Sequence, residues 1–415
     1  MNLLEQQLDY PLGDVLPDEG GTITVAPGIK WLRIGLPFAL NHINLWLLRD
    51  EMQDPRHDAI SPGKKLQGWT VVDCCISRPE SKAQWETIFA TQLEGLPILR
   101  VIVTHMHPDH IGLAHWLCER WTTPTHVCRL WVSATDYNSA RLGSQSTAGF
   151  GGEGAALFFA SHGLTDPDSI EKIKARTGYY PGMVPDVPKS YVRLMDGKTV
   201  AIGSGDDRHE WRCISGYGHA PEHIALYRAP KALSVPAPQE GVGDFGAALQ
   251  SPPILIGGDM ILPRISTNVS VYDMEPEADA LTLFLDSIDK YLLLPTDTLT
   301  LPSHGKPFYG LHTRITQLHD HHRDRLAEVM DACSANPCSA ADILPIMFKR
   351  ELDLHQTTFA MGEALAHLHL LWFEGKLQRQ LSSDGIYRFA ANETSTPRKQ
   401  RPTSAYQRGE PSSFN

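Results

Sequence analysis

Apolar and β-branched residues gather in short runs over the first third of the chain. Residues 22–36, 43–48 and 68–74 are such runs, and Pro37 with the following Asn41 separates the first two. Runs of this length and composition, bounded by turn residues, predict β-strands. We therefore expect the chain to open with an antiparallel part of a sheet.

Helical and strand patterns then alternate. Residues 81–93 space their apolar side chains for one helical face, and residues 111–121 have helix character as well. Residues 99–103 and 129–133 are short apolar runs of the strand type. Strands that alternate with helices predict an α/β layer.

Residues 135–191 are rich in glycine, serine and charged side chains and are longer than an ordinary connection. We interpret them as an inserted, mainly helical segment and a candidate substrate lid. The run 149–154 contains four glycines but lacks the Gly-Lys-Ser/Thr ending of a phosphate loop. It is typical of a hinge.

Later strands end at chemically active residues. We expect strands at 199–202, 211–215, 224–227, 254–258 and 299–301, and an exposed loop at 230–251. His219, Asp259 and His304 each follow one of these strands. They add to a histidine-rich segment after the strand at 99–103.

The last part of the chain predicts a separate small unit. A helix from residue 311 to 330 carries His319, His321, His322, Arg323 and Arg325, which we interpret as a solvated face, with a grip on an anionic substrate as the alternative. Residues 340–348, 358–374, 376–380 and 386–389 then suggest helix, helix, strand and strand. Residues 392–415 have few apolar side chains and predict a disordered tail.

Composition and charge are those of an ordinary soluble globular protein and favour a small ligand over nucleic acid. The chain has 415 residues, a formal net charge of −11, 42% hydrophobic and 20% charged residues. The acidic balance disfavours a polyanionic partner such as nucleic acid. No apolar run is long enough to cross a bilayer.

The cysteines and the first residues indicate the compartment. Seven cysteines without a C-x-x-C pair fit neither a disulfide framework nor a zinc ribbon. The N-terminal segment has acidic residues and no basic flank before an apolar core, so we expect no secretory signal. We predict a cytoplasmic protein.

The segment from His105 to His110 predicts a metal site. It places His105, His107, Asp109 and His110 directly after a buried strand. Imidazole and carboxylate ligands without a thiolate favour a catalytic zinc site that stays open for water, and they also suit manganese or iron. One short segment with ligands on two sides can serve two adjacent ions.

In these residues the chain resembles the metallo-β-lactamase superfamily, over about residues 20–325. The H-x-H-x-D-H segment, His219 in Gly-His-Ala-Pro-Glu-His, Asp259 in Gly-Gly-Asp-Met and His304 in Ser-His-Gly follow the family's motif order. The resemblance implies an αββα sandwich with the helical insert. It also implies that residues 1–330 form the catalytic domain.

The same resemblance implies a ligand set. His105, His107 and His219 would hold one divalent ion, and Asp109, His110 and His304 the other. Asp259 would bridge both. Asp73, at the end of a predicted strand, would orient a ligand histidine, and Asp109 would also orient a metal-bridging hydroxide or pass its proton to the leaving group.

Four more residues are candidates for substrate contact because they lie near strand ends on the expected active face. They are His42, Asn44, Tyr217 and Asn268. Asn268 belongs to the polar run 264–272, for which an ordinary turn is an equal alternative.

The order of elements at residues 331–391 resembles a winged helix, a module that several hydrolases of this superfamily append. Between residues 339 and 395 there are five basic and seven acidic side chains, so no basic face for nucleic acid is evident. We expect this module to pack against the catalytic domain or against the partner in a homodimer.

The sequence therefore predicts a two-metal hydrolase that cleaves an ester, thioester, lactone or related bond in a small molecule. Hydroxyacylglutathione hydrolases are the similar branch, and lactonases and phosphodiesterases share the general build. The alternatives are a nuclease or phosphodiesterase acting on short nucleic acid, and a non-enzymatic metal-binding regulator that contacts DNA.

Overall fold

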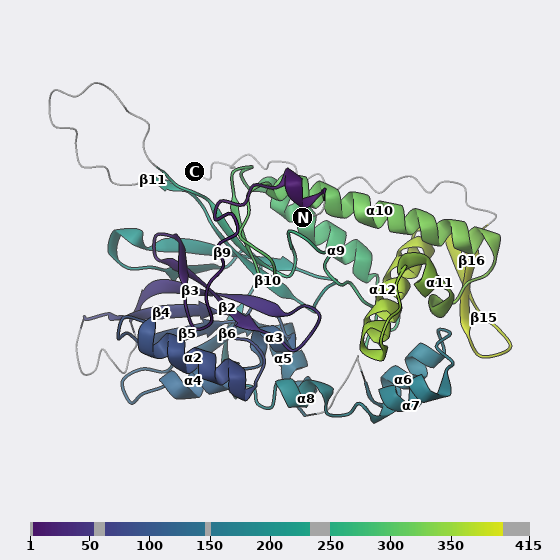
Figure 1. Cartoon of the computed structure of the whole chain (residues 1–415), viewed down its shortest axis with the longest axis horizontal. Coiled ribbons are helices and arrows are strands. Elements are labelled where there is room, and N and C mark those ends of the chain that lie inside the picture. Colours follow the sequence, from purple (N-terminus) through teal and green to yellow (C-terminus); the bar gives the residue numbers. More distant parts are fainter. Residues whose placement is uncertain (1–2, 54–62, 146–150, 233–249, 393–415) are drawn as a thin grey trace, which may run out of the picture.

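Two β-sheets packed face to face form the centre of the protein (Figure 1). The computed structural model describes residues 3–53, 63–145, 151–232 and 250–392. The predicted tail, apart from Asn392, lies outside the described residues, as do most of the predicted loop at 230–251 and Gly149 and Phe150 of the predicted hinge.

The first sheet has seven strands whose spatial order follows the sequence. They are β1 (Ile23–Ala26), β2 (Ile29–Gly35), β3 (His42–Met52), β4 (Leu66–Val72), β5 (Ile98–Ile102), β6 (Arg129–Ser133) and β7 (Tyr191–Leu194). Neighbours are antiparallel from β1 to β4 and parallel from β4 to β7. The antiparallel opening predicted from the sequence is confirmed, and β7 adds an edge strand that we did not predict.

The second sheet has five strands in the order β14-β13-β10-β9-β8. They are β8 (Thr199–Ile202), β9 (His209–Gly216), β10 (His223–Arg228), β13 (Ile254–Gly258) and β14 (Leu299–Pro302). A separate short pair consists of β11 (Lys231–Ala232) and β12 (Gln250–Ser251).

Helices cover the outer face of each sheet, which explains why strand β10 is buried along its whole length. Ile224 and Leu226 of β10 point between the sheets, whereas Ala225 packs toward the helical side. Because successive side chains of a strand alternate between faces, a strand covered on both sides is continuously apolar. The αββα sandwich is confirmed.

Four helices lie on the first sheet or at its edge, and two others cover the second (Figure 1). The first group is α2 (Pro79–Thr91), α3 (Pro108–Ile111), α4 (Ala114–Trp121) and α5 (Ala134–Gly143). The second is α9 (Ala280–Asp289) and α10 (Leu311–Ala335). Short 3-10 turns occur at Glu5–Gln7, Gly205–Asp207 and Lys290–Leu293.

The segment predicted as a helical insert is mainly helical in its described part. After α5 it contains α6 (Gly152–Ala160), α7 (Pro167–Ala175) and α8 (Tyr179–Met183). Phe159 and Ile173 belong to the same apolar cluster as residues of the C-terminal helices. The backbone of Ser161 accepts a hydrogen bond from Tyr387 N (2.8 Å). Helices α6 and α7 are therefore attached to the C-terminal end of the chain.

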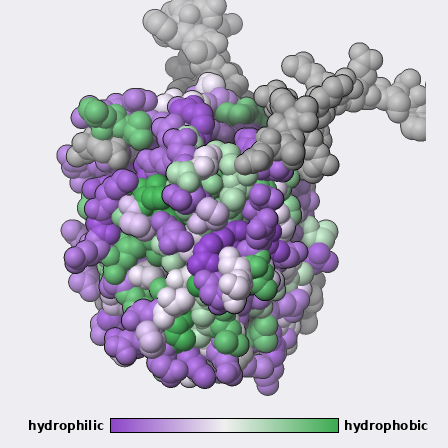
Figure 2. All heavy atoms as spheres, turned by 90° about the vertical axis from the view of Figure 1, so that its right-hand side faces the viewer, coloured by the Kyte–Doolittle hydropathy of each residue, from purple (hydrophilic) through white to green (hydrophobic). Residues whose placement is uncertain are grey.

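The C-terminal module consists of α11 (Ala340–Met347), α12 (Leu354–Phe373), β15 (Leu377–Leu381) and β16 (Tyr387–Ala391). This order of elements is the predicted one. Helix α12 packs closely on the loop after β13, where Val271 N donates to Gly362 O (3.1 Å). Figure 2 shows this end of the molecule with hydrophobic and hydrophilic residues interleaved on its surface. The apolar side chains of α12 face the shared core, so the module is a fixed part of the fold.

The polar helix α10 differs from its prediction at one residue. Arg323 is exposed, as expected, but His322 is buried against Phe284 and His367. The stretch is amphipathic, and the prediction counted charges without a helical period. None of the helices in the described ranges combines the length and apolarity that crossing a bilayer requires.

Candidate metal centre

The segment after β5 presents its ligands on two sides because a helix begins in the middle of it. His105 and His107 lie in extended chain, and His107 is the N-cap of α3. Pro108 occupies the first helical position, where its fixed φ suits a helix start. Asp109 and His110 then lie in the first turn of α3 and point to a different side from His107.

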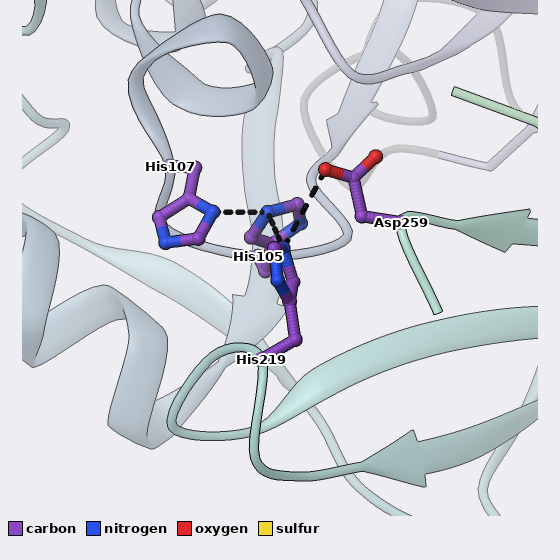
Figure 3. Close-up of side chains that lie close together, drawn as sticks. All are labelled: His105, His107, His219 and Asp259. Atoms are coloured by element: carbon purple, nitrogen blue, oxygen red, sulfur yellow. Dashed lines mark hydrogen bonds and ion pairs between the residues drawn. The ribbon is translucent and has the colours of Figure 1, made fainter. Parts of the chain in front are cut away.

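The first group of side chains is His105, His107, His219 and Asp259, whose ligand atoms all lie within 4.8 Å of one another (Figure 3). His105 Nε2 lies 2.9 Å from His107 Nδ1 and 3.2 Å from His219 Nε2. His219 Nε2 lies 3.5 Å from Asp259 Oδ2. Three imidazole nitrogens and one carboxylate oxygen thus converge on one point.

The second group is Asp109, His110 and His304, and Asp259 links it to the first. Asp259 Oδ1 lies 3.5 Å from His110 Nε2 and 3.4 Å from His304 Nε2. His304 Nε2 is also 3.4 Å from Asp109 Oδ2. The two oxygens of Asp259 therefore face different groups of histidines.

Glycine allows the chain to present Asp259 in this position. Gly258 has φ +55°, and a Cβ atom there would lie 2.0 Å from His223 Nε2. His223 is buried behind the site, and its Nε2 accepts a hydrogen bond from Asp259 N (3.3 Å). It belongs to neither group of converging side chains.

Hydrogen bonds at the far nitrogen orient three of the histidines. His219 Nδ1 is 2.7 Å from Asn268 O, and His304 Nδ1 is 2.7 Å from His42 O. His110 Nδ1 is 2.8 Å from the Asp73 carboxylate. A neutral imidazole carries one proton, so donation from Nδ1 leaves the lone pair of Nε2 directed at the centre.

Several of these inward-facing atoms are buried without a hydrogen-bond partner in the described part of the chain. They are His110 Nε2, His304 Nε2 and Asp259 Oδ1. Buried polar atoms are normally satisfied, and borderline divalent ions accept imidazole nitrogen and carboxylate oxygen. The donor set therefore fits divalent cations.

The pKa shifts of the histidines differ between the two groups. Burial lowers the pKa of His107 to about 3, and burial with the neighbouring His110 holds the pKa of His105 well below its usual value. Both are neutral at physiological pH, the form that coordinates metal. Burial would lower the pKa of His304, but Asp259 and Asp109 raise it to about 10, so this end of the site favours a positive charge.

Asp73 follows strand β4 and has φ +60°, a left-handed conformation that is uncommon for a side chain other than glycine. Its carboxylate accepts hydrogen bonds from Thr104 N (2.8 Å) and Thr104 Oγ1 (2.9 Å) as well as contacting His110. It lies where we expected a residue that orients a ligand.

Asp136, which was not among the predicted site residues, connects the two ligand-bearing loops. Its carboxylate accepts hydrogen bonds from Met106 N (2.8 Å) and Glu222 N (2.7 Å). Met106 lies between two of the histidines, and Glu222 lies three residues after His219. Burial raises the pKa of Asp136 to about 6. In the sequence it is an acidic residue in the first turn of a helix, so no local signal marks it.

A cavity of about 570 Å³ opens above the site. His107, Asp109, His219, Asp259 and His304 form part of its lining. Its other walls come mainly from four places, namely the loop after β2, helix α8 of the insert, the loop after β13, and helix α12 of the C-terminal module with the segment that precedes it. Pockets of this size hold small molecules.

Of the four candidate contact residues, Asn268 lines this cavity, and the other three do not. Asn44 is fully buried and donates to Pro302 O (2.8 Å). His42 accepts from Gly305 N (2.9 Å), so both residues support the turn that carries His304. The Lys290 ammonium lies over the ring of Tyr217, 5.3 Å from the ring centroid. Proximity to a strand end did not distinguish residues that face the cavity from residues that hold the loops.

Helix α8 is attached to the metal-binding segment. The Tyr180 hydroxyl donates to Met106 O (2.5 Å), and Tyr180 also lines the cavity. Asp136 and Tyr180 together hold both backbone polar groups of Met106. In this arrangement α8 is a wall of the cavity that is tied to the ligand-bearing segment.

Comparisons with known proteins match two parts of the chain to family models. Residues 66–200 match the family model described as metallo-beta-lactamase superfamily, and residues 326–392 match the model described as metallo-beta-lactamase-like, C-terminal domain. Both matches lie in regions that contribute to the site or to the cavity wall.

Proteins similar over most of the chain include a solved beta-lactamase domain protein from Burkholderia ambifaria. It is 49% identical, with 94% of this chain and 100% of that chain covered and a TM-score of 0.80. A metallo-beta-lactamase family protein from Thermus thermophilus shares the fold at 22% identity, with 89% of this chain and 100% of that chain covered and a TM-score of 0.61. The probable metallo-hydrolase YqjP of Bacillus subtilis (strain 168) is 22% identical over 370 residues, which are 86% of this chain and 96% of that protein.

Proposed function

Because this chain belongs to the metallo-β-lactamase superfamily of metal-dependent hydrolases, we propose that it uses two divalent cations to cleave an ester, thioester, lactone or related bond in a small molecule. His105, His107 and His219 hold one cation, and Asp109, His110 and His304 hold the other. Asp259 is shared. Zinc suits this set of imidazole nitrogens and carboxylate oxygens, and the lack of a thiolate ligand is typical of a catalytic site.

The observation that carries the proposal is the position of Asp259 between the two groups of histidines. Its Oδ2 is 3.5 Å from His219 Nε2, while its Oδ1 is 3.4 Å from His304 Nε2. Each oxygen of Asp259 faces a different group of histidines. This arrangement supports a role for Asp259 as a ligand of both cations. A single structural zinc would need only four of these seven side chains.

Bound divalent cations would lower the pKa of a bound water toward about 7 and polarise the oxygen of the scissile bond. The protein's own contribution is orientation. Asp73, Asn268 O and His42 O fix three imidazole rings, so the ligand atoms are in place before substrate enters.

Asp109 is the residue suited to proton transfer. It lines the cavity, and its carboxylate lies beside His304 and His110. Burial would raise the pKa of Asp109, but the adjacent His110 and His304 lower it, so the carboxylate is ionised at neutral pH. It can therefore hold the attacking water through a hydrogen bond and accept its proton for the leaving group.

The lining of the cavity supports a small-molecule substrate over nucleic acid. Leu36, Phe38, Leu262 and Phe348 contribute apolar surface, and Glu363 adds a carboxylate. A phosphodiester backbone is bound chiefly through basic side chains. Among the described residues that line this cavity, the basic ones are Arg350 and histidines.

Metal analysis combined with a substrate panel tests the proposal. Purified full-length protein, loaded with zinc, should contain about two metal ions per chain and hydrolyse members of an ester, thioester, lactone and phosphodiester panel. Activity should disappear on chelation and return when zinc is restored. Less than one metal per chain with no turnover on any substrate would overturn it.

A further inference from the structure

One wall of the cavity is a cluster of four rings centred on His355 of helix α12. The His355 ring lies 6.1 Å from Phe38, 5.5 Å from Tyr179 and 5.0 Å from Phe359, measured between ring centroids. The loop after β2, helix α8 and helix α12 each contribute to it. Since all four residues line the cavity, they offer a ligand a continuous aromatic surface.

His355 contributes to this wall as a neutral ring. Burial and the nearby Arg176 guanidinium lower the pKa of His355 from its ordinary value of 6.5. The imidazole is therefore uncharged at physiological pH, and its faces act as apolar surface in the same way as those of Phe38 and Phe359.

Glu363, two helical turns after His355 on α12, also lines the cavity. Within the described residues its carboxyl group accepts a single hydrogen bond, from Asn268 Nδ2 at the long distance of 3.4 Å. The carbonyl oxygen of Asn268 is the group that orients His219. Glu363 thus contacts Asn268, which in turn contacts the candidate ligand His219. The carboxyl oxygens of Glu363 can accept further hydrogen bonds from a ligand in the cavity.

The charges around the cavity disfavour a substrate with an anionic tail. Apart from the candidate ligands, its acidic side chains are Glu363 and Asp353. Among the described residues that line the cavity the one guanidinium is that of Arg350, which is exposed and donates to Gln356 Oε1 (2.8 Å). An anion held beside Glu363 would face its carboxylate, which is unfavourable at low dielectric. Arg325 is the cation whose charge reaches Glu363, but it is paired with Glu328 (2.8 Å) and does not line the cavity.

We propose that, within the hydrolytic function proposed above, this cavity selects an ester or thioester with an apolar acyl group and an uncharged, hydrogen-bond-donating remainder. The acyl group lies against the ring cluster around His355. Glu363 accepts a hydrogen bond from the uncharged remainder and excludes carboxylate-bearing carriers such as glutathione. The C-terminal module is then part of the substrate pocket, through Phe359 and Glu363.

Three thioesters that differ in one feature at a time test this inference. They are S-acetyl-N-acetylcysteamine, S-hexanoyl-N-acetylcysteamine and S-hexanoylglutathione. For zinc-loaded full-length protein at pH 8, kcat/KM for the neutral hexanoyl compound should exceed each of the other two by about tenfold or more. A preference for the glutathione thioester, or equal rates with the acetyl and hexanoyl compounds, would overturn the inference.

Two variants separate the roles of the two surfaces. Phe359→Ala should reduce the preference for hexanoyl over acetyl by about fivefold or more, and Phe38→Ala should act in the same direction if Phe359→Ala does not fold. Glu363→Gln should reduce the preference for the neutral over the glutathione thioester by about tenfold. Glu374→Gln, an exposed position at the C-terminal end of α12, is the matched control and should leave both ratios unchanged. Ratios that move as much in Glu374→Gln as in Glu363→Gln would contradict the role of Glu363.

Failure of the hydrolytic proposal gives a different result. If the metal-loaded protein hydrolyses none of the three thioesters or the wider panel, the proposed function fails. The inference about selectivity is then tested by binding. Calorimetry measures the affinity of the protein for uncleavable ketone analogues, in which a methylene replaces the thioester sulfur. Tighter binding of the neutral hexanoyl analogue supports the selectivity, and equal or weaker binding contradicts it.

Discussion

The carboxylate of Asp73 lies 2.8 Å from Nδ1 of His110, and it also accepts hydrogen bonds from both the backbone and the hydroxyl group of Thr104. This contact joins the end of β4 to the ligand-bearing segment after β5. It fixes the ring of His110 so that Nε2 faces Asp259 at 3.5 Å. A residue outside the two groups therefore sets the direction of a candidate ligand.

Asp73→Asn should weaken metal binding by about 10 to 100-fold, the usual cost of losing such an orienting carboxylate. The amide can no longer accept a full charge-assisted hydrogen bond from His110. The measurement is a competition titration with a chromophoric chelator. Asp168→Asn, on the exposed first turn of α7, is the control and should bind metal as the wild type does. Unchanged affinity in Asp73→Asn would remove the proposed orienting role.

Asp109→Ala should keep the fold but lose about 10² to 10⁴-fold in kcat, since it removes the candidate proton-transfer group. The four residues of the first group remain, so the variant should retain at least one metal ion per chain. Circular dichroism, metal analysis and turnover on the best substrate check the three expectations. Full activity in this variant would show that another residue handles the proton.

Asp136→Ala should weaken metal binding although Asp136 is not itself a candidate ligand. It leaves the partly buried N–H groups of Met106 and Glu222 without their acceptor. A fully buried donor left unsatisfied costs about 1 to 3 kcal/mol, so we expect a cost toward the lower end of this range for each group. We expect lower metal affinity together with lower stability, measured by chelator competition and urea unfolding.

Ser133→Ala is the matched control for Asp136→Ala. Ser133 Oγ accepts from Asp136 N as the N-cap of α5 and donates to its carboxylate, but it does not contact either loop. Its loss should cost about 1 kcal/mol of stability through the helix cap and leave metal affinity unchanged. Equal losses of affinity in both variants would mean that Asp136 acts only through helix α5.

The convergence of the candidate ligands was predictable because each of them follows a strand within a short, recognisable segment. Strand periodicity placed β5, β13 and β14 to within one or two residues, and the edge of a sheet brings strand ends together. The residues that support the ligands were harder to find. Asp136 contacts loops about 30 and 86 positions away in the sequence, and nothing in its own helix records those contacts.

The cavity wall illustrates the same limit. Phe38, Tyr179 and Phe359 belong to three elements far apart in the chain, and they meet only because α8 and α12 pack near the loop after β2. Charge counting in the C-terminal module addressed only its affinity for nucleic acid. It could not show that α12 lines the cavity, since that depends on how the module docks.

Removal of metal should destabilise the protein. Cations that bind only the folded chain add about 4 kcal/mol of stability at a free concentration 1,000 times the dissociation constant. EDTA should therefore lower the thermal midpoint by several degrees, and added zinc should restore it. His107→Ala should show a smaller response to EDTA because it begins with weaker binding. An identical midpoint with and without EDTA would contradict metal binding by the folded protein.

Glu363 should make the stability of the wild-type protein fall as the pH rises, and Glu363→Gln should lack this contribution. Burial raises the pKa of Glu363 from 4.5 to about 7. Between these values a rising pH deprotonates the unfolded chain while the folded protein keeps its proton, so stability falls across this window and is level above about pH 7. Glutamine does not ionise, and the thermal midpoint of Glu363→Gln should therefore rise relative to wild type between pH 5 and pH 8. Glu374→Gln should follow the wild type at both values. A constant difference between wild type and Glu363→Gln across this range would show that the carboxyl group is as well solvated in the cavity as in the unfolded chain.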